Sequence, residues 1–183
     1  MDYLAFSKLK MTGLHFRKAT PADFRAIAAL VNSAYRGDTS RNGWTHEADL
    51  IEGDIRTDEA ELSQLLSNPS AVILLCLNGE QLVGSVYLER DKNELYLGML
   101  SVDPKQQAKG IGKALLAKAD EYAGEQGCSA IVMTVISVRE ELINWYRKYG
   151  YKPTGETEPF PEDQHFGVPR KPLHFVVLKK SLV

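Results

Sequence analysis

The chain has 183 residues, of which 44% are hydrophobic and 25% charged, a composition typical of one folded globular domain. A formal net charge of −2 excludes the strongly basic character that draws proteins to nucleic acid or to anionic membranes. The longest apolar run, residues 71–77, is too short to span a bilayer, and residues 1–10 lack the apolar centre of a signal peptide. We therefore expect a cytoplasmic protein with no nucleic-acid or membrane partner.

The two cysteines and four histidines show no metal-binding pattern. Cys76 and Cys128 are far apart in the sequence, and no histidine stands at the spacing of a zinc ligand. Because free cysteines are usually buried, we expect both thiols to be structural and the protein to need no metal.

The first strand-like pattern begins at Leu14. Residues 1–13 are therefore predicted to be an N-terminal extension, and residues 14–183 a single domain. Thr20 and the proline after it supply an N-cap and a proline at the first helical position. Residues 22–35 continue with apolar side chains at helical spacing and are predicted to form a helix.

Residues 45–67 also have a helical pattern, with a break expected near Gly53 or at Arg56 and Thr57. Seven acidic residues lie in this segment: Glu47, Asp49, Glu52, Asp54, Asp58, Glu59 and Glu61. We interpret them first as a solvent-exposed helix face.

Three β-rich segments follow, at residues 71–77, 81–90 and 94–102. Asn78-Gly79 is a strong hairpin signal between the first two. The turn at residues 91–93 leads into the third.

The second half of the chain alternates helices and strands. The predicted elements are a helix at 110–126, a strand at 129–135, a helix at 140–149, a strand at 151–156, a long loop at 157–172 and a last strand at 173–180. The strand, helix, strand order from 94 to 135 implies a parallel crossover. Gly150 is placed to end its helix with a left-handed cap. Four prolines in the sixteen residues of 157–172 indicate a loop.

The helix that begins near Gly110 has no Ser, Thr, Asp or Asn at its start, so its first N–H groups lack a side-chain cap. Uncapped donors at the positive end of the helix dipole form a natural binding site for phosphate oxygens. Gly110 and Gly112 allow a ligand to approach the backbone, and Lys109 and Lys113 add positive charge. The segment from Gln107 to Lys113 is therefore predicted to bind an anion.

Two other phosphate-binding loops do not fit this segment. The nucleotide-hydrolase loop requires Gly where Gln107 stands and Ser or Thr where Ala114 stands. The dinucleotide fingerprint requires a small residue where Leu115 stands. An ordinary structural helix start is the remaining alternative.

The segment resembles the central motif of the GNAT superfamily of N-acetyltransferases, Q or R-x-x-G-x-G or A, which Gln107, Gly110 and Gly112 match. The preceding YLGMLSVDP is similar to the family's strand, and WYRKYGYKP to its later helix-to-strand segment. The resemblance covers residues 14–182 in the order of elements, and its similarity by letter is concentrated in residues 94–151.

The resemblance implies an α/β (α+β) fold with a GNAT-type mixed, splayed sheet of about seven strands flanked by helices. Acetyl-CoA, the implied cosubstrate, is expected in the V-shaped gap that opens after the strand ending at Val102. The implied cofactor-binding residues are Leu100, Ser101 and Val102 for the pantetheine arm and Gln107, Ala108, Lys109, Gly110, Ile111, Gly112 and Lys113 for the diphosphate. Arg139 stands where many members have an asparagine that contacts the coenzyme. It is a further cofactor-binding candidate, with a surface arginine as the equal alternative.

Acetyl transfer from a thioester to an amine requires a neutral amine and an acid that protonates the leaving thiolate. A lysine-like amine has a pKa of about 10.4, and tyrosine, with a pKa of about 10, keeps its proton at neutral pH. The resemblance assigns the acid to Tyr146, with Tyr149 of the same helix as its competitor. Tyr96 and Tyr122 are expected to pack in the core.

Glu94 is the first candidate for the base, because the family often has an acid on this strand. Alternation along the strand puts Glu94 on the same face as Tyr96 and Gly98. A β-bulge at Gly98 would change that alternation. An exposed glutamate beside a turn is the equal alternative, and Glu89 and Glu47 are the reserve candidates.

The acceptor is expected between the segment 45–67 and the loop before the last strand. The candidate substrate-binding residues are Trp44, Thr45, Phe160, His165 and Phe166. The acidic residues at 47–61 weakly favour a cationic acceptor. A small amine, an amino acid, an antibiotic and a protein N-terminus all stay open.

We therefore expect an N-acetyltransferase that moves an acetyl group from acetyl-CoA to a primary amine by direct attack in a ternary complex, as a monomer or homodimer. A non-catalytic domain that senses acyl-CoA is the alternative from another functional class. A transferase that uses a longer acyl-CoA as its donor is a further alternative.

Overall fold

A seven-stranded sheet in the order β1-β3-β4-β5-β6-β9-β7 forms the centre of the computed structural model, which describes residues 13–162, 165 and 167–183. Its strands are β1 (Leu14–Lys18), β3 (Ala71–Asn78), β4 (Gln81–Asp91), β5 (Glu94–Val102), β6 (Ala130–Ile136), β7 (Lys152–Pro159) and β9 (His174–Ser181). A separate pair joins β2 (Ile51–Glu52) to β8 (Val168–Pro169). The helices are α2 (Phe24–Tyr35), α3 (Gly37–Ser40), α4 (Glu59–Leu65), α5 (Ile111–Glu125) and α6 (Glu140–Arg147), with 3-10 turns at Pro21–Asp23 and Pro104–Gln106. The predicted mixed sheet of about seven strands is confirmed.

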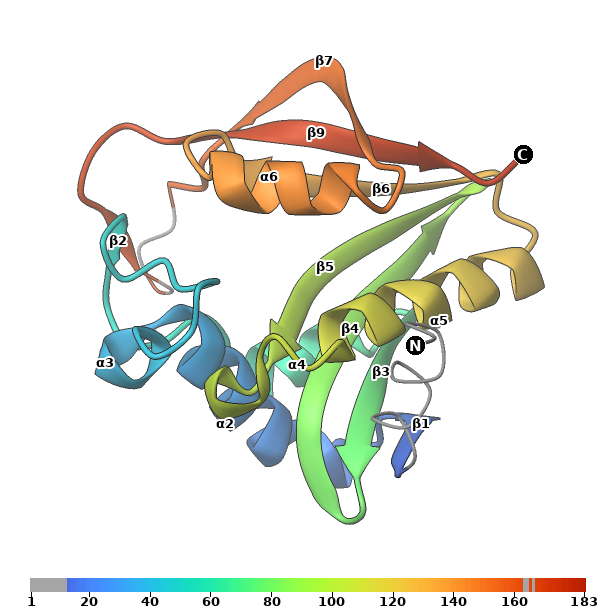
Figure 1. Ribbon diagram of the computed structural model, residues 1–183, viewed down its shortest axis with the longest axis horizontal. Coiled ribbons are helices and arrows are strands. Elements are labelled where there is room, and N and C mark those ends of the chain that lie inside the picture. Colours follow the sequence, from blue (N-terminus) through green and yellow to red (C-terminus); the bar gives the residue numbers. More distant parts are fainter. Residues whose placement is uncertain (1–12, 163–164, 166) are drawn as a thin grey trace, which may run out of the picture.

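The sheet splits between β5 and β6, its parallel neighbours. The two strands pair only from Glu94 opposite Ala130 to Tyr96 opposite Val132. Beyond that point they separate, with α6 above the gap and the start of α5 below it (Figure 1). The splayed geometry that the resemblance implied is therefore present, and the last six residues of β5 have a strand partner on one side only.

A β-bulge in β5 accompanies the split. Tyr87 of β4 lies opposite Gly98, whereas Ser85 lies opposite Ser101, so β5 holds one residue more than β4 over this stretch. Met99 takes up the extra length with φ of 45°, a left-handed conformation that is uncommon for a residue with a side chain. The bulge lies just beyond Gly98, so Glu94, Tyr96 and Gly98 do share a strand face as predicted.

Both faces of the sheet are covered by helices, which explains the unbroken apolar run of β3. Leu74 and Cys76 face the cluster that contains Leu115 of α5. Ile73 and its alternate neighbours face a second cluster built around Ile27 of α2. Free Cys76 and Cys128 are both buried, as predicted, and burial raises the pKa of the Cys76 thiol to about 11.

Several turn predictions are confirmed. β3 and β4 form a hairpin across Gly79, which has φ of 60°. Gly150, with φ of 94°, follows α6 and donates its N–H to the carbonyl of Arg147. The parallel crossover through α5 joins β5 to β6. Each of these features depends on short local signals.

The predicted broken helix at residues 45–67 is wrong for most of its length. Only α4 within it is helical, and the earlier part contains turns and the short strand β2. Asp58 caps α4 by accepting a hydrogen bond from the N–H of Glu61 at 2.8 Å. The acidic residues therefore do not form one helix face.

Two further predictions need correction. The strand predicted at residues 151–156 extends to Pro159, so the first part of the expected loop pairs with β9. Tyr96, which was expected in the core, is 37% exposed. Tyr122 is partly buried against the core, as predicted.

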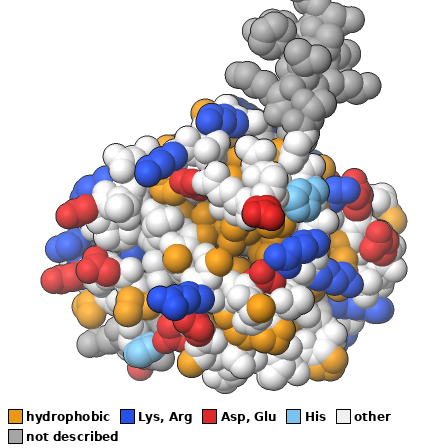
Figure 2. Space-filling view, turned by 90° about the horizontal axis from the view of Figure 1, so that it is seen from below, with side chains coloured by type: hydrophobic (Ala, Val, Ile, Leu, Met, Phe, Trp, Pro, Cys, Tyr) orange, Lys and Arg blue, Asp and Glu red, His pale blue; other side chains and the backbone are white. Residues whose placement is uncertain are grey.

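The surface mixes charges of both signs. Figure 2 shows one face on which hydrophobic side chains gather near the centre, with Lys, Arg, Asp and Glu interspersed around them. Among the described residues, no helix combines the length and the apolar character needed to cross a bilayer.

Close packing of α5 on β4 at Gly84 gives a first prediction. A Cβ at Gly84 would lie 2.9 Å from side-chain atoms of Ile111 and Leu115 and 3.2 Å from the carbonyl of Ser101. Gly84→Ala should therefore lower the free energy of unfolding by about 1–3 kcal/mol, as overpacking does. Urea denaturation measures the change.

Gly124 in α5 is the matched control, because a Cβ there meets no atom within 4 Å. Gly124→Ala should raise the free energy of unfolding by roughly 0.5–1 kcal/mol through helix propensity. Equal effects of the two substitutions would show that contact at Gly84 does not limit the approach of α5.

Candidate functional site

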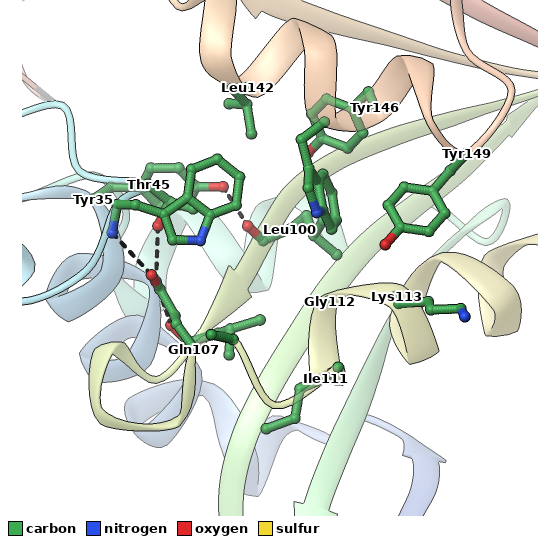
Figure 3. Close-up of a pocket in the computed structure, with 15 residues that line it drawn as sticks. Tyr35, Thr45, Leu100, Gln107, Ile111, Gly112, Lys113, Leu142, Tyr146 and Tyr149 are labelled. Atoms are coloured by element: carbon green, nitrogen blue, oxygen red, sulfur yellow. Dashed lines mark hydrogen bonds between the residues drawn. The ribbon is translucent and has the colours of Figure 1, made fainter. Parts of the chain in front are cut away.

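A cavity of about 280 Å³ lies in the gap beside the open part of β5. Its walls come from the end of α2, the segment after α3, the end of β5, the start of α5 and one side of α6 (Figure 3). Eight of the eleven predicted cofactor-binding residues line it: Leu100, Val102, Gln107, Ala108, Gly110, Ile111, Gly112 and Lys113. The other three, Ser101, Lys109 and Arg139, do not. We name this space the first cavity.

The start of α5 has the properties that the sequence indicated. Gly110 occupies the N-cap position with φ of 86° and supplies no side-chain cap, and Ala108 before it has φ of 63°. Lys113, in the first turn of α5, also lines the cavity. Lys109 instead donates to Gln106 Oε1 at 2.9 Å on the exposed side. Unsatisfied helix N–H groups and a lysine therefore face a space that can hold an anion.

Gln107 connects the loop to the opposite wall. Its Oε1 accepts from the N–H of Trp44 at 3.0 Å, and its Nε2 donates to Thr45 Oγ1 at 3.0 Å (Figure 3). A longer contact of 3.4 Å joins Nε2 to the carbonyl of Val102. Gly43 leaves room for this arrangement, because a Cβ there would lie 2.7 Å from the amide of Gln107.

Arg139 holds the same wall from the side of α6. Its guanidinium donates to the carbonyls of Thr45 and Trp44, at 3.2 and 3.3 Å, and to Glu141 Oε1 at 2.7 Å. Arg139 is only 5% exposed. It is therefore neither a surface arginine nor a residue of the first cavity, and its donors are already used by protein groups.

Aromatic rings close the first cavity on the side of α6. Trp44 and Trp145 meet edge to face with their centroids 5.8 Å apart, and Tyr149 lies 4.9 Å from Trp145. A Cβ on Gly112 would lie 3.2 Å from the Trp145 ring, so α5 and α6 approach closely only because position 112 is glycine. Trp44 is 40% exposed and forms part of the rim.

A second cavity, of about 320 Å³, lies on the other side of the same gap. The residues common to both cavities are Tyr35, Leu100, Leu142 and Tyr146. These four residues therefore mark the place where the two cavities meet.

Two tyrosines stand at this junction, Tyr146 buried and Tyr35 partly buried. The hydroxyl of Tyr35 donates a hydrogen bond to the carbonyl of Leu100. Burial raises the pKa of Tyr35 to about 12 and raises the pKa of Tyr146 well above its usual value of about 10. Within the described residues the Tyr146 hydroxyl has no hydrogen-bond partner, so its proton is both retained and available.

The acids considered as bases lie in different places. Glu94, at the closed end of the split, forms an ion pair with Lys179 and lines neither cavity. Glu89 accepts from the Tyr87 hydroxyl at 2.6 Å and also lies outside both. Glu47 lines the second cavity and forms an ion pair with Arg36. Of the three, only Glu47 reaches the gap.

The predicted acceptor residues are also divided. Trp44 and Thr45 line the first cavity rather than the second. Phe160 stacks on Phe175 and lines a third cavity of about 360 Å³ that adjoins the second. His165 lies near Asp58 in a different pocket, and Phe166 lies outside the described residues.

Sequence reasoning missed several residues that line the cavities. Tyr35 follows Val31 by one helical turn on the buried face of α2, so its orientation was predictable, but its contact with Leu100 joins distant segments. Leu142 and Trp145 belong to the predicted helix that carries Tyr146, where their apolar side chains were a usable signal. For Arg56 the only signal in the sequence was its position at the break predicted in the helical pattern of residues 45–67.

Comparison with known proteins gives a family match. The model of the acetyltransferase (GNAT) family matches residues 29–151. Human N-acetyltransferase 8B is 28% identical over 125 residues, which are 64% of this chain and 54% of that protein. The N-acetylaspartate synthetase of Danio rerio is 32% identical over 123 residues, 65% of this chain and 42% of its own length. The chain thus spans about half the length of these curated relatives.

One bacterial relative matches over most of its length. The uncharacterized N-acetyltransferase YhfO of Bacillus subtilis is 28% identical over 145 residues, 76% of this chain and 90% of that protein. Among solved structures, yncA of Salmonella typhimurium, determined with its cofactor acetyl-CoA, has a TM-score of 0.67 at 20% identity, covering 93% and 94% of the two chains. A ribosomal-protein-alanine N-acetyltransferase of Brucella melitensis has a TM-score of 0.68 at 20% identity, covering 91% and 99%. At these identities the structures show the same fold.

Proposed function

Because the chain belongs to the GNAT family of acetyltransferases, we propose that it transfers an acetyl group from acetyl-CoA to a primary amine by direct attack in a ternary complex. The observation that carries this proposal is the junction of two cavities at Leu100 and Tyr146. One cavity opens onto a helix start suited to a diphosphate, and the other has space for a second reactant. Two reactants held on either side of one junction can react directly.

The first cavity fits acetyl-CoA by the chemistry of its donors. The uncapped start of α5, with Gly110 and Lys113, offers N–H groups and positive charge to a diphosphate. The open edge of β5 between Leu97 and Val102 offers backbone groups to an extended arm. Acetyl-CoA supplies the acetyl group as a thioester, whose sulfur leaves as a thiolate.

Tyr146 is proposed as the acid. Its side chain lies at the junction, and burial keeps its pKa high, so the hydroxyl stays protonated and can donate to a developing negative charge. Tyr35 also keeps its proton, because burial raises its pKa to about 12, but that proton is engaged by the carbonyl of Leu100. We therefore assign proton donation to Tyr146 and a positioning role to Tyr35.

Glu47 replaces Glu94 as the proposed base. Among the three acids considered, it is the one that lines the second cavity, where an amine would stand beside Tyr146. Its ion pair with Arg36 holds it in place, so proton transfer directly or through a water is proposed for this carboxylate. Relatives that are named N-acetyltransferase or N-acetylaspartate synthetase support an amine as the acceptor. A cytoplasmic location and a monomer or homodimer stay predictions.

The proposal is tested by incubating the protein with acetyl-CoA and a broad panel of amines and measuring free coenzyme A thiol. Turnover with at least one amine is expected. Tight binding of acetyl-CoA without turnover over the whole panel would contradict it and would favour a non-catalytic acyl-CoA-binding domain.

Gly110 should be essential for acetyl-CoA affinity because its left-handed conformation sets the direction of the α5 N–H groups. Gly110→Ala imposes roughly 1–2 kcal/mol of backbone strain at this site. We expect calorimetry to show acetyl-CoA binding at least about tenfold weaker. Gly79→Ala is the matched control: Gly79 also has positive φ with no atom near its Cβ position, but it lies in the β3-β4 hairpin. Equal affinities of the two variants would exclude α5 as the diphosphate site.

Tyr146→Phe should lower kcat by about 10²–10⁴-fold while sparing acetyl-CoA affinity, because only the proton is lost. Single-turnover measurement is used so that product release does not hide the effect. Since the pKa of Tyr146 is raised, its ionisation should cause no loss of rate below about pH 10. Tyr149→Phe is the control from the same helix. A large loss at 149 and none at 146 would reassign the acid.

Glu47→Gln should lower the single-turnover rate by about 10²-fold or more at neutral pH. The loss should shrink as the pH approaches the pKa of the amine, because more of the amine is then already neutral. Glu94→Gln, whose carboxylate lies outside both cavities, should leave the rate near that of the parent protein. A pH-independent loss for Glu47→Gln, or a larger loss for Glu94→Gln, would remove Glu47 from this role.

A further inference from the structure

Three arginines border the second and third cavities, and one differs from the others. Arg36 and Arg139 are 3% and 5% exposed. Arg36 pairs with Glu47, and Arg139 donates to Glu141 and to two carbonyls. Arg56 lines both cavities, yet within the described residues its guanidinium forms no hydrogen bond or ion pair. Of these three arginines, Arg56 is thus the one whose charge no described residue pairs with.

The backbone at Arg56 is fixed although its guanidinium is not. Asn32 of α2 accepts from the N–H groups of Arg56 and Thr57, at 2.6 and 3.1 Å, and donates to the carbonyl of Thr57 at 2.9 Å. Thr57 is fully buried. Because the backbone of Arg56 is already fixed and no described residue engages its guanidinium, binding a ligand there should cost little conformational entropy.

The charge of Arg56 acts at the junction of the cavities. It lowers the pKa of Tyr35, in opposition to the stronger effects of burial and of the Glu47 charge. The second cavity also has apolar walls, which include Met133, Ile136 and Phe175. A partly desolvated guanidinium beside such walls favours an anionic partner, above all a carboxylate that matches its planar donors.

The acidic residues of 47–61 do not give the cavity a negative character. Glu47 is paired with Arg36, Asp49 with Arg41 and Glu52 with Arg170. Asp58 and Glu61 accept hydrogen bonds at the start of α4, from the N–H of Glu61 and the hydroxyl of Thr57. Glu158 of β7 also lines the second cavity, but it is exposed, so water screens its charge. The ion pairs of Glu47, Asp49 and Glu52 therefore weaken the support for a cationic acceptor.

We propose that the acceptor is an amino-acid-like molecule whose carboxylate is bound by Arg56 while its amine stands near Tyr146. This inference rests on the proposed acetyl transfer to an amine in the second cavity. It narrows the acceptor from any primary amine to an amine that carries a nearby carboxylate. Arg56 is then a residue of substrate specificity, with no part in proton transfer.

The test measures binding, so that it does not depend on turnover. The full chain, saturated with coenzyme A, is titrated by calorimetry with L-alanine, L-leucine and L-phenylalanine and with the amide of each. An acid and its amide share the ammonium group and differ in the carboxylate. At least one acid should bind about tenfold or more tightly than its amide.

Arg56→Gln should weaken binding of that acid by about ten- to a hundredfold and leave its amide unchanged. Arg56→Lys should bind the acid with an affinity between those of the parent protein and Arg56→Gln, because lysine keeps the charge but lacks the planar pair of donors. Arg25→Gln is the control, an exposed arginine of α2 that lines neither cavity. It should bind the acid like the parent protein.

The outcomes separate this inference from the proposed function. Equal binding of acids and amides, no binding of any acid, or undiminished acid binding by Arg56→Gln would overturn the role of Arg56. Release of coenzyme A thiol with amines that lack a carboxylate would then leave the acetyl transfer intact. Arg56-dependent binding of an acid without thiol release for any amine would support the carboxylate site and contradict the transferase.

Discussion

The separation of β5 from β6 is the constraint on which the site depends. The strands pair at three positions and then part, and the extra residue at Met99 bends β5 away within the stretch that would otherwise continue the sheet. A flat continuation would have joined the two halves and left no gap. The split therefore creates both cavities and places Leu100 between them.

A gap in a sheet must be held open by contacts other than ladder hydrogen bonds. Here the segment Trp44-Thr45 acts as the connecting wall, with Gln107 holding it from the α5 side and Arg139 from the α6 side. Gln107 accepts from the Trp44 N–H and donates to the Thr45 hydroxyl, while Arg139 donates to the carbonyls of both residues. Most of these bonds are partly buried, where an unmatched polar group is costly. The glutamine of the loop motif therefore fixes the geometry of the site.

Local signals in the sequence predicted local structure well. Asn78-Gly79 marked the hairpin, and the missing cap before α5 marked its N–H groups as free for a ligand, because both depend on the backbone preferences of a few neighbouring residues. The resemblance supplied the splayed sheet. What failed required contacts between distant segments: the helical pattern at 45–58 was overridden by the packing of those residues around Asn32 and the short strand β2. Periodicity cannot report such competition.

Glu94 shows the same limit within the site. Its strand face was predicted correctly, since β5 alternates regularly from Glu94 to Gly98. Strand alternation, however, predicts which face of the sheet a side chain is on, but not how far along the gap between β5 and β6 it lies. The split opens away from Glu94, which stays at the paired end with Lys179, while Glu47 reaches the second cavity from a segment with no strand register at all. The two tyrosines at the junction also differ by a contact between distant segments. Burial raises the pKa of both, but the Tyr35 hydroxyl donates to the carbonyl of Leu100, whereas no described residue accepts a hydrogen bond from Tyr146.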